Sequence, residues 1–459
     1  MRLSPRALTT GGILALLVLT AGWYLGSLLG LSGWKLWVLR GAVWALGALA
    51  VFLVYRLISG KKPSGSIPGN PEIQAQMAAA EKHLRIAGVV GKGGLKSLPV
   101  VLVLGPSQSG KTSSVTASAM EKEFLAGDGE AGPIPPPTGA LNLWYHGRTV
   151  VLEVGEAGLR SEEDWDRILG ELRPRGWSAL FREHPARSVV LCVGCDWLRE
   201  VRRDELMAMA KALRASLAEG EAVLVSRLPL YVLFTKLDEV PHFTEFVENL
   251  SEDDASHPLG YTLPLGEEED PGVFGQWQTR RLSRAVDRVF QALAARRTEV
   301  LARDSDEEAR AMAYEFPREF RKITDLAVDF LVELTRPSQL RICHFLRGFY
   351  FTGQRPPPQG EEVPATPAPR PVQVPRGATM VFDPSQLRAS PEPGGQGPSR
   401  GPGWAFLGRF FPGILLRDEA ARGASFGGPR TAYRKRLLLG SGVALLVLLS
   451  LALTVSYLG

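Results

Sequence analysis

An apolar run that ends in a glycine-rich turn, LPVVLVLGPSQSGKT at residues 98–112, narrows the possible folds more than any other part of the chain. The turn at 105–112, GPSQSGKT, satisfies the pattern G-x-x-x-x-G-K-[ST]. The run before it is typical of a buried strand, and the following TSSVTASAMEKEFLA favours a helix. Strand, loop and helix in this order predict an α/β fold with a phosphate-binding loop, whose backbone N–H groups point at phosphate oxygens.

The loop supplies a defined set of predicted contacts for a nucleoside triphosphate and Mg²⁺. Lys111 is expected to reach the β- and γ-phosphates, and the Thr112 hydroxyl is expected to take a Mg²⁺ coordination position. The residues predicted to bind the cofactor, GTP or ATP, are those of the loop and its border: Gly105, Ser109, Gly110, Lys111, Thr112 and Ser113.

A second motif, TKLD at residues 235–238, ends the apolar run LPLYVLF. In P-loop GTPases a tetrad of the form [NT]-K-x-D at such a strand end reads the base, because its Asp accepts two hydrogen bonds from guanine. The motif therefore predicts that Thr235, Lys236 and Asp238 line a base pocket. A contact with the base is better supported than a preference for guanine.

The metal side of the expected site departs from the GTPase pattern. Such a site has an Asp at the end of the second core strand, in the form D-x-x-G, where this chain reads VVLEVGEAG. Counting back from Gly158 puts Gly155 at the Asp position, whereas counting along the strand makes Glu153 the acid. Glu156 is a weaker candidate, and simple surface acids are the alternative. The sequence thus predicts nucleotide binding more strongly than hydrolysis, with Glu153 as the candidate catalytic acid.

Further apolar runs recur at 149–155, 188–194 and 228–235, with helix-like segments between them. Runs of Val and Leu without polar alternation predict a parallel sheet that is covered on both faces. From about residue 276 the pattern becomes helical, and FLRGFYFT at 345–352 is expected to return to the sheet.

Three long stretches, at 11–30, 36–59 and 437–459, carry almost no charge, and each is close to the ~20 apolar residues that a helix needs to cross a bilayer. Basic residues flank them at Arg2, Lys61 and Arg434, which predicts a multi-pass protein whose large middle part is cytoplasmic. Much of the +5 formal net charge is therefore expected to face membrane lipid, and nucleic acid is not an expected partner.

The predicted fold class is α/β: a P-loop, small-GTPase-like parallel sheet domain with an added helical subdomain and three transmembrane helices. Residues 404–436 include the aromatic run WAFLGRFFPGILL, which is expected either to lie at the membrane interface or to dock on the cytoplasmic domain. The expected organisation is a transmembrane hairpin (1–60), a P-loop NTPase-like cytoplasmic domain (71–270), a helical subdomain with a return strand (271–352), a disordered Pro/Gly-rich linker (353–403), a juxtamembrane segment (404–436) and a third transmembrane helix (437–459).

Several segments together resemble the N-terminal half of the IcmF/TssM family, inner-membrane components of bacterial type VI secretion systems. They are the phosphate loop, LRPRGWSALFREHPARSVVLCVGCDWL at 172–198, LPLYVLFTKLDEVPHFTEFVENLS at 228–251, LRGFYFTG at 346–353 and FLGRFFPGILLRDEA at 406–420. The resemblance implies a scaffold component of the bacterial inner membrane with a cytoplasmic nucleotide-binding domain. It also implies, as partners, a TssL-like inner-membrane subunit, baseplate components and further copies of the chain.

The chain departs from that family in two places. The family has Asp-Thr-Ala-Gly where this chain reads VGEAG, and its members continue past the third span into a periplasmic part, whereas this sequence stops at Gly459. A separate polypeptide is expected to supply that part, or the role is absent. Two other functions stay open: a membrane-anchored NTPase that drives assembly, and a GTPase-type receptor in protein targeting.

Overall fold

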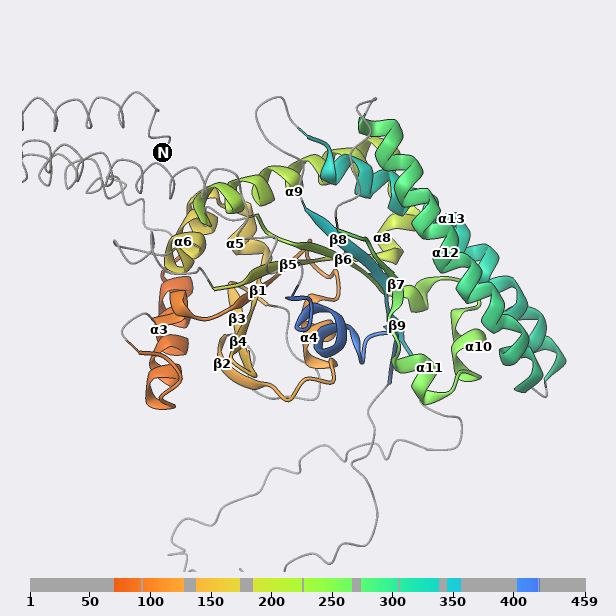
Figure 1. Cartoon of the computed structure of the whole chain (residues 1–459), viewed down its shortest axis with the longest axis horizontal. Coiled ribbons are helices and arrows are strands. Elements are labelled where there is room, and N and C mark those ends of the chain that lie inside the picture. Colours follow the sequence, from red (N-terminus) through yellow and green to blue (C-terminus); the bar gives the residue numbers. More distant parts are fainter. Residues whose placement is uncertain are drawn as a thin grey trace, which may run out of the picture. The chain divides into compact units, whose positions relative to one another are not determined.

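An eight-stranded sheet runs through the described part of the chain, with the strand order β2-β3-β4-β1-β5-β6-β8-β7 (Figure 1). The computed structural model describes residues 70–91, 94–127, 138–173, 185–224, 227–265, 274–303, 306–337, 345–355, 403–419 and 421. The strands are β1 (Val100–Leu104), β2 (Glu123–Gly127), β3 (Leu141–His146), β4 (Thr149–Val154), β5 (Arg187–Gly194), β6 (Leu230–Thr235), β7 (Leu259–Thr262) and β8 (Leu346–Phe351).

Helices pack on this sheet and begin at recognisable capping residues. The Asn70, Ser161 and Asp306 side chains each accept a hydrogen bond from a backbone N–H of the first turn, as N-caps do. The long helices are α3 (Pro71–Ile86), α6 (Glu162–Leu172), α9 (Arg203–Leu224), α12 (Phe274–Arg303) and α13 (Glu307–Thr335). The shorter ones are η1 (Gly94–Ser97), α4 (Lys111–Thr116), α5 (Glu156–Arg160), α8 (Cys195–Glu200), η2 (Leu237–Glu239), α10 (Phe243–Glu248) and α11 (Glu252–Ser256).

The sheet is mixed, which corrects the predicted parallel sheet. The strands β4, β1, β5, β6 and β8 are parallel neighbours, but β2 and β3 pair antiparallel at one edge and β7 pairs antiparallel with β8 at the other. The helix expected after the phosphate loop ends at Thr116, and part of that segment forms β2. Phe124 of β2 packs edge-on against Trp144 of β3, so pairing with the neighbouring strand overrides the local helix preference.

The predicted fold class included three transmembrane helices, and this part of it is also wrong for the residues that the structure describes. Within the described ranges, no helix is both long enough and apolar enough to cross a membrane. The stretches predicted to do so, 11–30, 36–59 and 437–459, lie outside those ranges, as do residues 356–402 of the predicted linker. The described structure is a mixed α/β fold, and the predicted domain limits stay predictions.

The two faces of the sheet bury different sets of side chains. Along β5, Val189, Leu191 and Val193 face the larger cluster, which includes α3, α6, α9, α12 and α13. The alternate residues Val190 and Cys192 face a second cluster. Period-two alternation of strand side chains explains why both sets are apolar, because each face needs its own cover.

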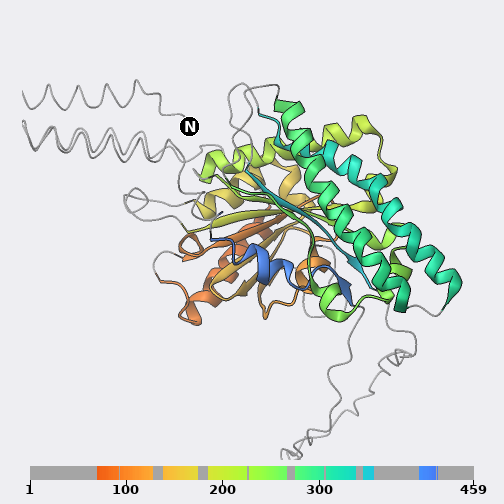
Figure 2. The ribbon, with the colours of Figure 1, turned by 45° about the vertical axis from the view of Figure 1, so that its right-hand side comes forward.

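The second face is covered by α4 and by a segment near the C-terminus, which we call the strap (residues 403–419 and 421) (Figures 1 and 2). It contains β10 (Trp404–Ala405) and the π-helical turn η4 (Phe410–Leu415). Phe410 and Phe411 are fully buried, and the Phe410 ring lies 4.9 Å from the Tyr350 ring. Of the two places expected for this aromatic run, the structure therefore has the docked one.

A buried ion pair fixes the far end of the strap. The Asp418 carboxylate accepts a hydrogen bond from Arg347 Nε at 2.5 Å and another from the Tyr231 hydroxyl at 2.8 Å. The side chains of Arg347 and Asp418 are only 12% and 7% exposed. Burial by itself raises the pKa of Asp418, but the hydrogen bonds from Arg347, the Ala421 N–H and Tyr231 outweigh it and keep the pKa below its ordinary value.

Replacing Phe410 by Ala should lower the free energy of unfolding by about 3 kcal/mol or more, since it removes a buried ring from the second cluster. Thermal or urea unfolding of the full chain measures this. The control is Tyr314→Ala, at a ring that is 50% exposed, and it should cost no more than about 1 kcal/mol. Equal losses in the two variants would contradict a docked strap.

Candidate functional site

The phosphate loop follows β1 directly and leads into α4, the order that the sequence predicts. Gly105 has φ 151°, and a Cβ built on it would lie 2.3 Å from the Cys192 carbonyl oxygen. The loop therefore leaves β1 so close to the end of β5 that only glycine fits. Ser109 Oγ donates to the Pro106 carbonyl at 2.9 Å, and Gly110 at φ 71° precedes the helix.

The Lys111 ammonium lies inside this loop. Its Nζ donates hydrogen bonds to the carbonyl oxygens of Gly105 at 2.8 Å and Pro106 at 2.6 Å, and the residue is 6% exposed. Burial lowers the pKa of Lys111, and the neighbouring acidic groups, Cys192, Glu153 and Glu156, act in the opposite direction. The cation is thus held by neutral carbonyls at the place where a phosphate would offer it charged oxygens.

Glu153 faces the loop from β4 and is fully buried, so it is not a surface acid. The parallel register places it beside Val103, two residues before the loop begins. Its Oε1 accepts a hydrogen bond from the Thr112 hydroxyl at 2.5 Å, and its Oε2 accepts one from Asn142 Nδ2 at 3.3 Å. Thr112, the predicted metal ligand, is therefore hydrogen-bonded to Glu153, the candidate catalytic acid.

Two residues of this cluster were not predicted from the sequence. Thr138 Oγ1 lies 3.0 Å from Thr112 Oγ1 and accepts a hydrogen bond from Asn142 Nδ2 at 2.7 Å. A signal for Asn142 exists, because it is a polar residue in the otherwise apolar start of β3, LNLW. Thr138 follows a run of prolines, and its local sequence shows no comparable signal.

The backbone around Gly155 leaves little space for a side chain at that position. A Cβ built on Gly155 would lie 2.3 Å from the Gly139 carbonyl oxygen and 2.6 Å from that of Thr138. Its φ is −69°, so the restriction is contact with neighbouring backbone and not an unusual conformation. A side chain at position 155 would meet this backbone, whereas Glu153 lies beside Thr112, and its catalytic role stays a prediction.

Three groups of the cluster offer the oxygen atoms that Mg²⁺ prefers as ligands: the hydroxyls of Thr112 and Thr138 and the Glu153 carboxylate. Among the described residues, no group of three or more His, Cys, Asp or Glu side chains is placed to hold a metal ion by itself. A Mg²⁺ ion would therefore keep several waters and phosphate oxygens as ligands, which is its usual behaviour in nucleotide sites.

The tetrad at 235–238 lies at the end of β6, beside the loop. Thr235 is fully buried, and its Oγ1 donates to the Ser109 carbonyl at 2.7 Å, so it steadies the phosphate loop and does not line an open pocket. Lys236 Nζ lies 2.6 Å from Asp196 Oδ2, a residue not predicted for the site. Asp238 Oδ1 accepts a hydrogen bond from the Gln354 N–H at 2.7 Å.

Ser113 lies in α4, where its carbonyl accepts a hydrogen bond from the Ala117 N–H at 2.9 Å. Its side chain makes no contact that defines a role in the site. The structure thus brings together the loop, Thr112, Glu153 and Thr235. Lys236 and Asp238 follow directly after β6, with Asp238 in η2.

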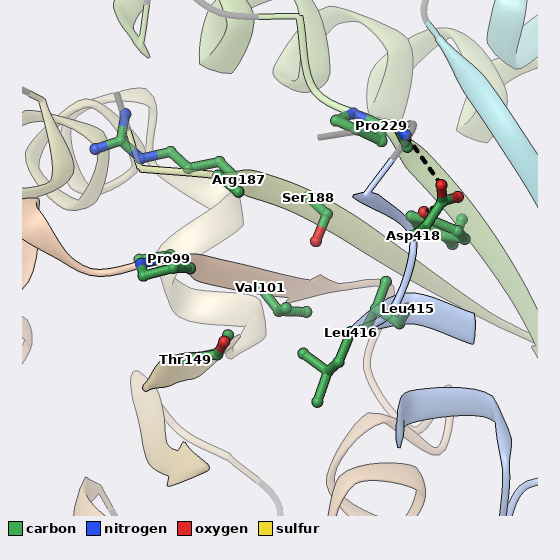
Figure 3. A pocket seen from close by; sticks show the side chains of 13 residues that line it. Pro99, Val101, Thr149, Arg187, Ser188, Pro229, Leu415, Leu416 and Asp418 are labelled. Carbon is green, nitrogen blue, oxygen red and sulfur yellow. Dashed lines mark hydrogen bonds between the residues drawn. The ribbon is translucent and has the colours of Figure 1, made fainter. Parts of the chain in front are cut away.

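A small pocket opens at the opposite end of the same strands (Figure 3). Its lining includes Pro99, Thr149 and Pro229, which stand at or just before the first residues of β1, β4 and β6. The Arg187 side chain extends away from Leu415 and Asp418 there (Figure 3), and its Nη2 donates to the Leu172 carbonyl. The phosphate loop follows the carboxyl end of β1, so this pocket is not part of the candidate site.

A comparison with known protein families assigns the chain to one of them. Residues 160–445, more than half of its length, match the model of the IcmF-related N-terminal domain. The chain belongs to this family. The match confirms the resemblance seen in the sequence, and it includes the tetrad on β6 and the strap, whereas the phosphate loop and Glu153 precede it.

One relative is the type VI secretion system component TssM1 of Pseudomonas aeruginosa (strain PAO1), which is 28% identical over 264 residues. That alignment covers 56% of this chain and 23% of the relative. The chain therefore spans about a quarter of the length of the protein that it matches.

The close contacts at Gly155 lead to a stability prediction. Gly155→Ala should destabilise the fold by about 1–3 kcal/mol, because the Cβ meets backbone that cannot move aside cheaply. Gly170→Ala on α6 is the control: nothing lies within 4 Å of its Cβ position, so a helix former there should be neutral or stabilising. Thermal unfolding of both variants is the measurement, and a harmless Gly155→Ala would mean that residues 138–139 do not pack there.

Proposed function

We propose that this chain is a type VI secretion component whose described domain binds a nucleoside triphosphate with Mg²⁺ at residues 105–112. The observation that carries the nucleotide part is the 2.5 Å hydrogen bond between the Thr112 hydroxyl and the buried Glu153 carboxylate. A serine or threonine after the loop lysine and an acid on the adjacent strand are the two protein groups that hold Mg²⁺ in P-loop NTPases. Here they meet although 41 positions separate them in the sequence.

Each residue of the site has a proposed role. Lys111 exchanges its two carbonyl partners for phosphate oxygens, and Thr112 binds Mg²⁺ through its hydroxyl. Glu153 holds Thr112 and adds negative charge near the ion, while Thr235 fixes the loop through Ser109. Lys236 and Asp238 contact the base, which is guanine or adenine.

We propose that the site serves binding more than turnover. Phosphoryl transfer depends on a positioned water and on stabilisation of charge in the transition state. Glu153 is already engaged by Thr112 and Asn142, and position 155 has no room for the acid that a D-x-x-G pattern would supply. A nucleotide that is bound and seldom hydrolysed suits a scaffold component better than an NTPase that drives assembly.

Membership of the family and the TssM1 relative support the secretion role. We propose that the domain acts in the part of the system that is assembled at the bacterial inner membrane. The expected partners there are a TssL-like subunit, baseplate components, membrane lipid and other copies of the chain. Co-purification of the full chain with its neighbours in the secretion system tests these partners.

Lys111→Ala should weaken binding of GTP and ATP at least about tenfold, because a hydrogen bond to a charged group is worth about 1.5–3 kcal/mol. Calorimetric titration of the full chain with each nucleotide and Mg²⁺ measures the affinity. Lys211→Ala, at an exposed position on α9, is the matched control and should bind as the wild type does. The nucleotide proposal fails if the wild-type chain binds neither nucleotide.

Glu153→Gln tests the metal side of the site. Glutamine keeps the size and an acceptor for Thr112 but removes the charge, so affinity measured with Mg²⁺ should fall about tenfold while affinity measured with EDTA stays nearly unchanged. Glu163→Gln on the exposed side of α6 is the control.

We expect wild-type hydrolysis to be no faster than about 10⁻⁴ s⁻¹, the rate of an unstimulated small GTPase. Fast turnover that survives Glu153→Gln would favour the NTPase function.

A further inference from the structure

We propose that the strap supports the nucleotide site. By pairing with β9 it helps to position Asp238, so that docking of the strap and binding of the base stabilise each other. This inference rests on the proposed nucleotide binding. Its structural basis is a continuous set of contacts from Asp238, through β9 (Gly353–Gln354), to residues on the far side of the predicted linker.

The turn after β8 holds the base loop in place. The Gln354 N–H donates to Asp238 Oδ1 at 2.7 Å, and the Leu237 N–H donates to the Thr352 carbonyl at 3.0 Å. These two bonds tie residues 237–238 to residues 352–354. The orientation of the Asp238 carboxylate therefore depends on where the backbone of β9 lies.

The strap pairs with β9 and helps to hold it in place. Trp404 and Ala405 of β10 pair antiparallel with Gln354 and Gly353, in a two-stranded sheet separate from the main one. Thr352 Oγ1 also donates to the Ala405 carbonyl at 2.8 Å. Gln354 also follows β8 by only three residues, and the Thr352 N–H donates to the Phe234 carbonyl at 2.8 Å, so β8 and the docked strap together set the position of the Gln354 N–H.

The rest of the strap is anchored on the two strands that lead to the base loop. Tyr231 at the start of β6 and Arg347 at the start of β8 both bind Asp418, and Tyr350 of β8 packs on Phe410. The opposite ends of β6 and β8 carry Thr235 and the turn before β9. Loss of the Asp418 anchor should thus loosen β10, and with it the support of Asp238.

Docking of the strap is not imposed by its neighbours in the sequence. Residues 356–402 stand between it and β9 in the sequence, so its place beside β9 depends on the contacts described above. By linkage, if the docked strap raises the affinity for a nucleotide, the nucleotide favours docking by the same factor.

Asp418→Asn in the full chain is the test, because it leaves the buried Arg347 guanidinium without its charged partner. The control is Asp204→Asn, which removes the carboxylate of an ion pair with Arg202 whose side chains are 67% and 76% exposed. Titrations use GTP, ATP and inorganic tripolyphosphate, each with Mg²⁺. Tripolyphosphate has no base and reports on the phosphate loop alone.

We expect Asp418→Asn to weaken the tighter-binding nucleotide at least about fivefold, with tripolyphosphate binding unchanged and Asp204→Asn equal to the wild type. Equal loss for nucleotide and tripolyphosphate would mean that the strap supports only the overall fold, and it would overturn the inference. Wild-type binding of nucleotide with no effect of Asp418→Asn would overturn the inference and leave the proposed function standing. A wild-type chain that binds none of the three probes overturns both.

Hydrogen exchange on the wild-type chain supplies a readout that needs no variant. The amides of 404–416 should exchange more slowly when the nucleotide is added, by the same factor of about five or more, and tripolyphosphate should leave them unchanged. Exchange in the strap that ignores the nucleotide would overturn the coupling, whatever the variant does.

Discussion

The central strands of this protein are apolar on both faces, and the rest of the structure depends on the need to cover them. All five residues of β1 and all six of β4 and β6 are buried, so neither face of the sheet can be left to water. Long helices cover one face. On the other face, α4 is short, and the strap supplies the aromatic side chains that complete the cover.

Because helices cover one face of the sheet and the strap covers much of the other, the strap lies next to the candidate site. The loop that follows β1 and the tetrad that follows β6 lie at the carboxyl ends of parallel strands, where open α/β sheets bind their ligands. The strap begins with β10, which pairs with β9 next to Asp238, and then crosses the second face. A segment needed for the core is therefore in contact with a segment proposed to read the base.

The polar contacts of the site are concentrated in buried positions, where they also serve the fold. Glu153, Asn142 and Thr235 are each at most 1% exposed, and each is hydrogen-bonded within the cluster or to the loop. A satisfied buried network is rigid, whereas a partly satisfied one is costly. Phosphate contacts from Lys111 would therefore be made by a loop whose support is preformed.

The sequence alone was sufficient for features that depend on local pattern. The glycines and Lys111 of the loop follow from the spacing of the motif, and the five parallel strands follow from unbroken apolar runs, because a strand buried on both faces has no polar alternation. The edge strands β2, β3 and β7 were missed, since their pairing is set by neighbours and not by their own composition.

Only the tertiary structure shows that Glu153 lies beside Thr112 and that the backbone of residues 138–139 fills the space at position 155, which no local pattern reveals. It also decided where the aromatic run at 404–416 lies. An amphipathic segment packs on whatever apolar surface is left uncovered, and that surface exists only after strands distant in the sequence have paired. The contacts of Asp196, Asp238 and Asp418 arise in the same way, from residues that the folded sheet brings together.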